Sequence, residues 1–118
     1  MSASPCEAQV RVVDDTAVVD LSGDINRDSD ATLTSAYNEA SRMSSTILLN
    51  FTDTGYINST GIAVIVGILA RSRADGKEVR ACGLSDHYKE IFEITRLSDF
   101  MMIFSDETSA VGGTPTPA

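Results

Sequence analysis

A short polar stretch, just before the most apolar segment of the chain, holds the residues best suited to chemistry. Asn58, Ser59 and Thr60 stand in a row and are followed by Gly61. A serine hydroxyl in such a position can act as a nucleophile or can receive a phosphoryl group. The same residue types also cap helices, because their side-chain oxygens accept hydrogen bonds from the first backbone N–H groups. From the pattern alone we favour capping, with Ser59 or Asn58 as the N-cap and Thr60 beginning the helix.

No general base accompanies Ser59 in the sequence. The single histidine, His87, stands in the first turn of a predicted helix among charged neighbours, and we interpret it as a solvated surface residue. Adjacent carboxylates such as Asp14 and Asp15 fall at a predicted turn, and no glycine-rich phosphate loop with its lysine is present. We therefore expect a protein that is not an enzyme and that needs no cofactor and no metal.

Composition limits the class of partner. The 118 residues are enough for one domain with a hydrophobic core, and nine Lys and Arg against seventeen Asp and Glu give a net charge of −8. This charge repels nucleic acid and anionic lipid, so we expect neither as a partner. Two cysteines without a metal-site or disulfide spacing, and no apolar run long enough to span a bilayer, predict a cytoplasmic protein.

The first half of the chain predicts a hairpin, a helix and a central strand. Apolar runs at 10–13 and 17–21 flank a polar turn, and Gly23 and Asp24 end the second run. Apolar residues at helical spacing up to Met43 then predict an amphipathic helix, capped near Asp28 or Ser29. The uninterrupted apolar run 46–51 predicts a strand covered on both faces, and the polar stretch 52–61 predicts a loop at its end.

The second half alternates helix and strand. Residues 61–74 are apolar on almost every side and predict a largely buried helix. A strand over 78–83, a helix capped by Ser85, a strand over 101–104 and a short helix opened by 105–107 follow. This order predicts an α/β fold: a mixed, mostly parallel sheet that opens with a hairpin and has helices packed on it. We expect one domain over 8–111, between a flexible N-terminus, 1–7, and a disordered tail, 112–118.

These features together resemble a stand-alone STAS domain, over residues 10–111. The most specific part is 47–62, ILLNFTDTGYINSTGI, which is similar to the strand, loop and Asp-Ser-Ser/Thr-Gly motif of that family. The segments 21–25, LSGDI, and 94–100, ITRLSDF, support the resemblance. The sequence departs from the motif at Asn58, where the family usually has Asp.

The resemblance implies an anti-sigma factor antagonist that regulates transcription by partner switching. Ser59 matches the family's phosphorylated serine. The unphosphorylated protein would bind an anti-sigma factor with serine kinase activity and so free the sigma factor. Phosphorylation of Ser59 would block binding, and a metal-dependent serine phosphatase would reverse it. Partner contacts are expected at the motif and at the end of the hairpin, namely at Asp24, Asn26, Asn58, Ser59, Thr60 and Gly61.

Two other functions remain open at this point. A STAS domain can also serve as a scaffold without switching, or as the regulatory subunit of a stress-signalling assembly or lipid transporter. A scaffold would self-associate, whereas we expect the soluble antagonist to be a monomer or a weak dimer. An unrelated enzyme with Ser59 as nucleophile would need a base, and His87 is the last candidate for that role.

Overall fold

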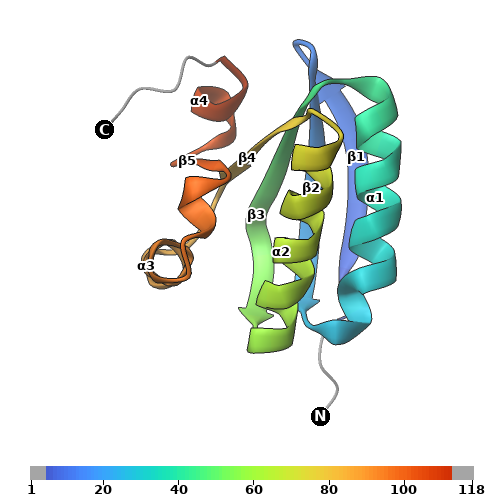
Figure 1. Cartoon of the computed structure of the whole chain (residues 1–118). Coiled ribbons are helices and arrows are strands. Elements are labelled where there is room, and N and C mark those ends of the chain that lie inside the picture. Colours follow the sequence, from blue (N-terminus) through green and yellow to red (C-terminus); the bar gives the residue numbers. More distant parts are fainter. Residues whose placement is uncertain (1–4, 113–118) are drawn as a thin grey trace.

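The computed structural model describes residues 5–112 and contains a hairpin followed by alternating helices and strands (Figure 1). Residues 1–4 and 113–118, which belong to the two ends predicted to be flexible, lie outside the described residues. The strands are β1 (Glu7–Val13), β2 (Thr16–Ile25), β3 (Thr46–Ile57), β4 (Glu78–Cys82) and β5 (Met102–Phe104). The helices are α1 (Asp30–Met43), α2 (Ser59–Ala74), α3 (Asp86–Ile94) and α4 (Glu107–Gly112).

The five strands form one mixed sheet in the order β1-β2-β3-β4-β5. The β1–β2 hairpin is antiparallel, while β2, β3, β4 and β5 pair in parallel. This arrangement confirms the predicted α/β fold and the predicted central place of β3. Because parallel strands need a crossover between them, each of the later strands is preceded by a helix.

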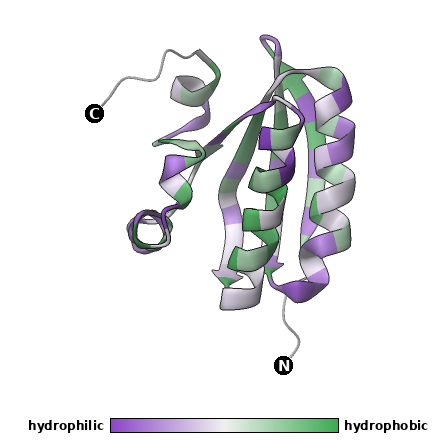
Figure 2. Ribbon diagram, in the orientation of Figure 1, coloured by the Kyte–Doolittle hydropathy of each residue, from purple (hydrophilic) through white to green (hydrophobic). Residues whose placement is uncertain are grey.

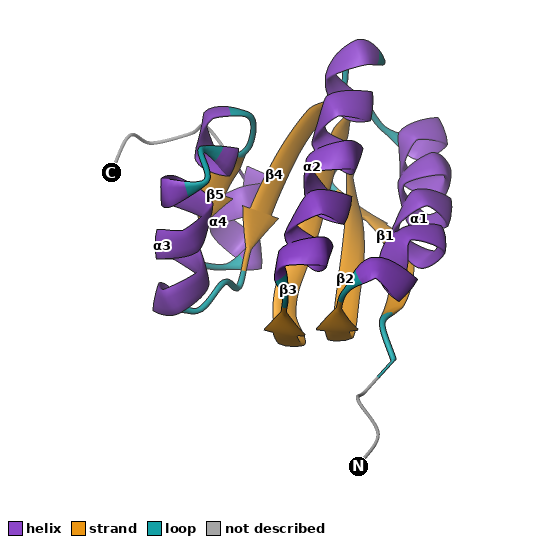
Figure 3. Cartoon of the chain, turned by 60° about the horizontal axis from the view of Figure 1, so that its bottom comes forward, coloured by secondary structure: helices purple, strands orange, loops and turns teal. Residues whose placement is uncertain are grey.

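Side chains on the two faces of the sheet enter different clusters, as the alternation along a strand requires. Val19 and Leu49 belong to the main core, together with residues of α1, α2 and α3. Their neighbours Val18 and Leu48 point the other way and form a small cluster with Ala110 of α4. Three helices therefore cover one face, and α4 covers part of the other (Figure 3).

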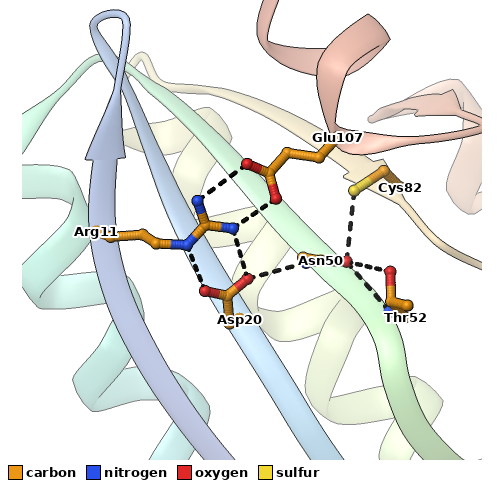
Figure 4. A network of polar contacts seen from close by, with 6 residues as sticks. All are labelled: Arg11, Asp20, Asn50, Thr52, Cys82 and Glu107. Atoms are coloured by element: carbon orange, nitrogen blue, oxygen red, sulfur yellow. Dashed lines mark hydrogen bonds and ion pairs between the residues drawn. The ribbon is translucent and has the colours of Figure 1, made fainter.

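A polar network fixes α4 to the far face of the sheet (Figure 4). The guanidinium of Arg11 in β1 lies between two carboxylates, donating to Asp20 Oδ1 at 3.0 Å and to Glu107 Oε2 at 2.9 Å. Arg80 Nη1 donates to the backbone carbonyl of Ala110 at 2.6 Å. The short helix is thus held at both ends, by an ion pair and by a charged hydrogen bond.

Two strands are longer than the sequence predicted. Gly23 and Asp24 were expected to end the second strand, and 52–57 to form a loop, but β2 continues to Ile25 and β3 to Ile57. The two extensions pair with each other, with register shifts on the way. The reason is that most of the added residues of β3 are polar and exposed, so no apolar pattern marks them as a strand.

The prediction that α2 is largely buried was wrong. Only one side of the helix enters the core, through Gly61, Ile65, Ile68, Leu69 and Ser72. Val66, on the other side, is 45% exposed. Figure 2 shows green along the middle of α2 and purple in its last turns, whereas α1 is mostly purple and pale. α2 therefore carries more apolar residues than pack into the core of the domain.

No helix within residues 5–112 combines the length and the apolar character needed to cross a membrane.

Candidate functional site

Ser59 is the first residue of α2, and its side chain is exposed. Asn58 precedes it in an extended conformation and caps the helix: its Oδ1 accepts hydrogen bonds from Gly61 N at 2.8 Å and from the Thr60 hydroxyl at 2.7 Å. The sequence left the cap open between Asn58 and Ser59, and the structure assigns it to Asn58. Within residues 5–112 the Ser59 hydroxyl has no hydrogen-bond partner.

The end of β2 lies directly beside the start of α2. The backbone N–H of Asn58 donates to the carbonyl oxygen of Ile25 at 3.2 Å, and Asp24 and Asn26 flank Ile25 in the chain. The Asp24 carboxylate accepts a hydrogen bond from the backbone N–H of Tyr56 at 2.9 Å, so it helps to join β2 and β3. The six residues singled out by the sequence therefore gather where β2 and β3 end, at the C-terminal ends of these strands.

Asn26 has a local structural function. Its Oδ1 accepts from Asp28 N at 2.9 Å, while its own backbone N–H donates to Ser29 Oγ at 2.9 Å. These bonds form a capping box around η1, a 3₁₀ turn (Arg27–Ser29) that leads into α1. Ser29 occupies the predicted N-cap position of α1 but makes no side-chain capping bond to it. The predicted position is correct and the expected hydrogen bond is not, because the Ser29 hydroxyl serves η1.

Position 61 has room only for glycine, because the backbone of Ile25 lies against it. Gly61 is buried, and a β-carbon at this position would collide with the backbone of Ile25. The sequence analysis expects Gly61 to contact a partner; within the chain, its close approach is to Ile25 of β2. Gly61 thereby sets how tightly the start of α2 sits on the sheet.

Tyr88 supports the site and was not predicted to do so. Its hydroxyl oxygen accepts a hydrogen bond from the backbone N–H of Ile57 at 2.8 Å, two residues before Ser59. No local signal indicates this bond, because the two residues are 31 positions apart and meet only through the fold.

The start of α2 can accept an anion. Among residues 5–112, the backbone N–H groups of Ser59 and Thr60 have no acceptor, since Asn58 occupies only the N–H of Gly61. Free N–H groups and the positive end of the helix dipole favour a negative charge at this place. A phosphate on Ser59 would lie beside these donors.

The other candidates for chemistry make no hydrogen bond to the side chain of Ser59 within residues 5–112. His87 is exposed in the first turn of α3, as predicted, and its ring packs at 5.0 Å from that of Tyr88. Cys82 is fully buried on the far face, where Sγ lies 3.5 Å from Asn50 Oδ1 (Figure 4). Burial, with the nearby carboxylates, raises the pKa of the Cys82 thiol to about 11, so the reactive thiolate is suppressed at neutral pH.

Comparison with known families identifies the fold. The model of the STAS domain matches residues 7–110. The chain belongs to the STAS domain family. Among curated relatives, this STAS domain is 37% identical over 57 residues to the anti-sigma-B factor antagonist of Staphylococcus aureus (strain NCTC 8325 / PS 47), covering 48% of the chain and 53% of the relative. It is 40% identical over 55 residues to that of Listeria monocytogenes serovar 1/2a, covering 47% and 48%. The match thus spans about half the length of these relatives.

Solved structures share the whole fold at low sequence identity. An anti-sigma factor antagonist from Mycobacterium paratuberculosis has a TM-score of 0.77 at 13% identity, covering 91% of this STAS domain and 92% of that chain. The Bacillus cell fate determinant SpoIIAA in its phosphorylated form has a TM-score of 0.60 at 21% identity, covering 86% and 94%. These likenesses establish the fold, and the site has to be argued from its own geometry.

Proposed function

We propose that this protein is a non-catalytic anti-sigma factor antagonist whose binding to its partner is switched off by phosphorylation of Ser59. One observation carries the proposal. Of the polar side chains at the site, those of Asp24, Asn26, Asn58 and Thr60 are engaged in hydrogen bonds that hold the local structure. The Ser59 hydroxyl is exposed and is the one left available to a kinase.

Asn58 in place of the family's usual Asp is compatible with this function. The capping bonds to Gly61 N and Thr60 Oγ1 use a side-chain oxygen, which the amide supplies as well as a carboxylate does. The substitution removes one negative charge beside Ser59. A phosphate added there meets less like-charge repulsion than it would next to Asp.

The switch acts at the surface and leaves the fold in place. A phosphate adds about −1.5 to −2 charges where the α2 N-terminus favours an anion, so α2 remains folded. A partner that covers Ser59 with apolar or acidic groups would have to bury this charge, and each 1.4 kcal/mol of penalty weakens binding about tenfold.

The proposed partner is an anti-sigma factor with serine kinase activity. A metal-dependent serine phosphatase would remove the phosphate from Ser59 and restore binding. The relatives named as anti-sigma-B factor antagonists support this role.

The test mixes the purified protein with ATP, magnesium and the serine-kinase anti-sigma factors of its own organism. Phosphate is located by mass spectrometry, and complex formation is followed before and after the reaction. We expect one phosphate on Ser59 and loss of the complex. Ser59→Ala should bind and stay bound, while Thr60→Val, which removes the neighbouring hydroxyl, should still be phosphorylated at Ser59. Binding that persists without any phosphate would overturn the switch in favour of a scaffold.

A further inference from the structure

A groove of about 500 Å³ lies between the C-terminal half of α2 and the turn η2 (Leu97–Asp99). Its walls are mainly apolar. They include Val66, Leu69, Ala70, Leu97 and Phe100, together with Arg73. A volume of this size falls within the range of small-molecule sites, which combine apolar walls with a few polar groups.

The groove explains why α2 has apolar residues outside the core. The sequence predicts a helix buried on nearly all sides, but Val66 remains 45% exposed and Phe100, across the groove, 52% exposed. Two large hydrophobic side chains facing one concave surface are unusual for the outside of a small domain, and clustered exposure of this kind marks binding sites.

Arg73 is the polar group that defines the occupant. Within residues 5–112 it makes no ion pair, whereas Arg71 lies 3.9 Å from Asp75, and Arg96 lies 2.9 Å from Asp99. Asp75, which follows α2, and Asp99 of η2 are therefore each paired with another arginine. The groove wall therefore holds an arginine without an ion pair within residues 5–112, although the chain as a whole carries −8.

The position of Arg73 leaves its donors available. The guanidinium carbon lies 5.3 Å from the centre of the Phe100 ring, in a cation–π contact that orients the side chain. Within residues 5–112 the N–H groups of Arg73 donate no hydrogen bond, and two of them can bind one carboxylate together. The one wall hydroxyl, that of Thr95, already donates to the Ile91 carbonyl at 2.7 Å.

The length of the groove favours a small molecule over a polypeptide. From Val66 to Ala74 the helix rises about 12 Å, at 1.5 Å per residue. That length matches about four residues of extended peptide, whereas the volume of about 500 Å³ lies in the range of small-molecule sites. We propose that the groove binds a small amphiphilic carboxylate, with its apolar body against Val66, Leu69 and Leu97 and its carboxylate on Arg73.

This site is separate from Ser59. Arg73 lies fourteen positions after Ser59 in α2, a rise of roughly 21 Å, so phosphorylation and Arg73 involve opposite ends of the helix. The inference therefore does not rest on the proposed switch. A Ser59→Glu variant should bind the ligand as the unchanged protein does.

The test is a titration of the isotope-labelled protein with sodium decanoate, below its micelle concentration, followed by amide NMR shifts. We expect saturable shifts confined to residues 66–74 and 95–100.

Arg73→Gln should weaken binding about fivefold or more, while Arg71→Gln, which removes a paired arginine from the same helix, should change it less than about twofold. Decanol and a decyl ammonium salt should both bind more weakly than decanoate. Ala70→Phe, which fills the groove from an exposed position, should abolish binding.

Several results would overturn the inference. These are shifts that do not saturate, shifts elsewhere on the molecule, equal effects of the two arginine variants, or equal binding of decanol and decanoate. Sedimentation decides whether a second copy occupies the groove instead: a dimer that decanoate leaves intact and that Ala70→Phe disrupts would refute a small-molecule site. Should Ala70→Phe fail to fold, the two arginine variants and the decanol comparison still test whether Arg73 holds a carboxylate in the groove.

Discussion

Gly61 packs so closely on Ile25 that a β-carbon at position 61 would lie 2.1 Å from the Ile25 carbonyl oxygen. That oxygen belongs to backbone and also accepts the hydrogen bond from Asn58 N, so it cannot move aside without disturbing the helix cap. The contact ties the last residue of β2 to the first turn of α2. This contact positions Ser59, the residue proposed above as the switch.

We expect Gly61→Ala to destabilise the protein by about 1–3 kcal/mol, the usual cost of forcing an extra methyl group into a packed site. Gly67→Ala is the matched control, because it lies in the same helix with open space around the added β-carbon. That variant should gain up to about 1 kcal/mol from helix propensity. Urea unfolding of both proteins measures the difference. Equal stability of the two variants would show that the close contact with Ile25 has no energetic weight.

Tyr88→Phe tests the support that α3 gives to the end of β3. The change removes the acceptor for the buried backbone N–H of Ile57 and keeps the ring, so we expect a loss of about 1–3 kcal/mol. Tyr56→Phe is the control, because Tyr56 is 67% exposed. Thermal unfolding gives the stability, and hydrogen exchange at the Ile57 amide should accelerate only in the Tyr88 variant. Unchanged exchange at Ile57 would contradict the assigned role.

Most of the fold was predictable because the apolar pattern follows the core closely. The hairpin pairs Val10 with Val19 within two apolar runs, and Ser85 caps α3 as predicted, with its Oγ accepting from Tyr88 N at 3.3 Å. Patterns of this kind depend only on residues close together in the chain.

The parts that were missed depend on pairing across the chain. Residues 52–57 become strand because β2 lies beside them, and their own side chains are mainly exposed and polar. The contact between Tyr88 and Ile57, and the one between Arg11 and Glu107, join residues 31 and 96 positions apart. Local periodicity contains no information on such contacts. The exposed side of α2 was missed for a related reason, since its apolar residues line a groove and do not enter the core.

The Arg11 network should make stability depend on acid pH. The Arg11 guanidinium, helped by Asn50, holds the pKa of the Asp20 carboxyl below its usual range. A carboxyl with a lowered pKa in the folded state stabilises the protein above its unfolded-state pKa of about 3.9. That contribution disappears as the pH falls through the lower folded-state pKa.

We therefore expect Asp20→Asn to cost roughly 1 kcal/mol near neutral pH, because these groups are about a third exposed and solvent weakens the pair. The difference from the unchanged protein should shrink as the pH falls below about 4. Asp99→Asn breaks a pair with Arg96, which is 80% exposed, and should have a smaller effect at every pH. Urea unfolding across a pH series measures both. A difference for Asp20→Asn that persists at the acid end would mean that the lost interaction is not the charged one.

The N-cap of α2 offers a last test, which separates stability from switching. Asn58→Ala removes the acceptor for Gly61 N and Thr60 Oγ1 and should cost about 1 kcal/mol, whereas Asn58→Asp keeps the acceptor and adds a charge that the helix dipole favours. Asn58→Asp should therefore be at least as stable as the unchanged protein.

Phosphorylation of Ser59 should leave the melting temperature of the unchanged protein equal or higher, because the α2 N-terminus stabilises the new anion. In Asn58→Asp the same phosphate lies beside a carboxylate, so its stabilising effect should be smaller. If phosphorylation lowers the melting temperature of both proteins to the same extent, the phosphate does not lie at the free N–H groups of Ser59 and Thr60, and the switch would have to act by loosening the fold.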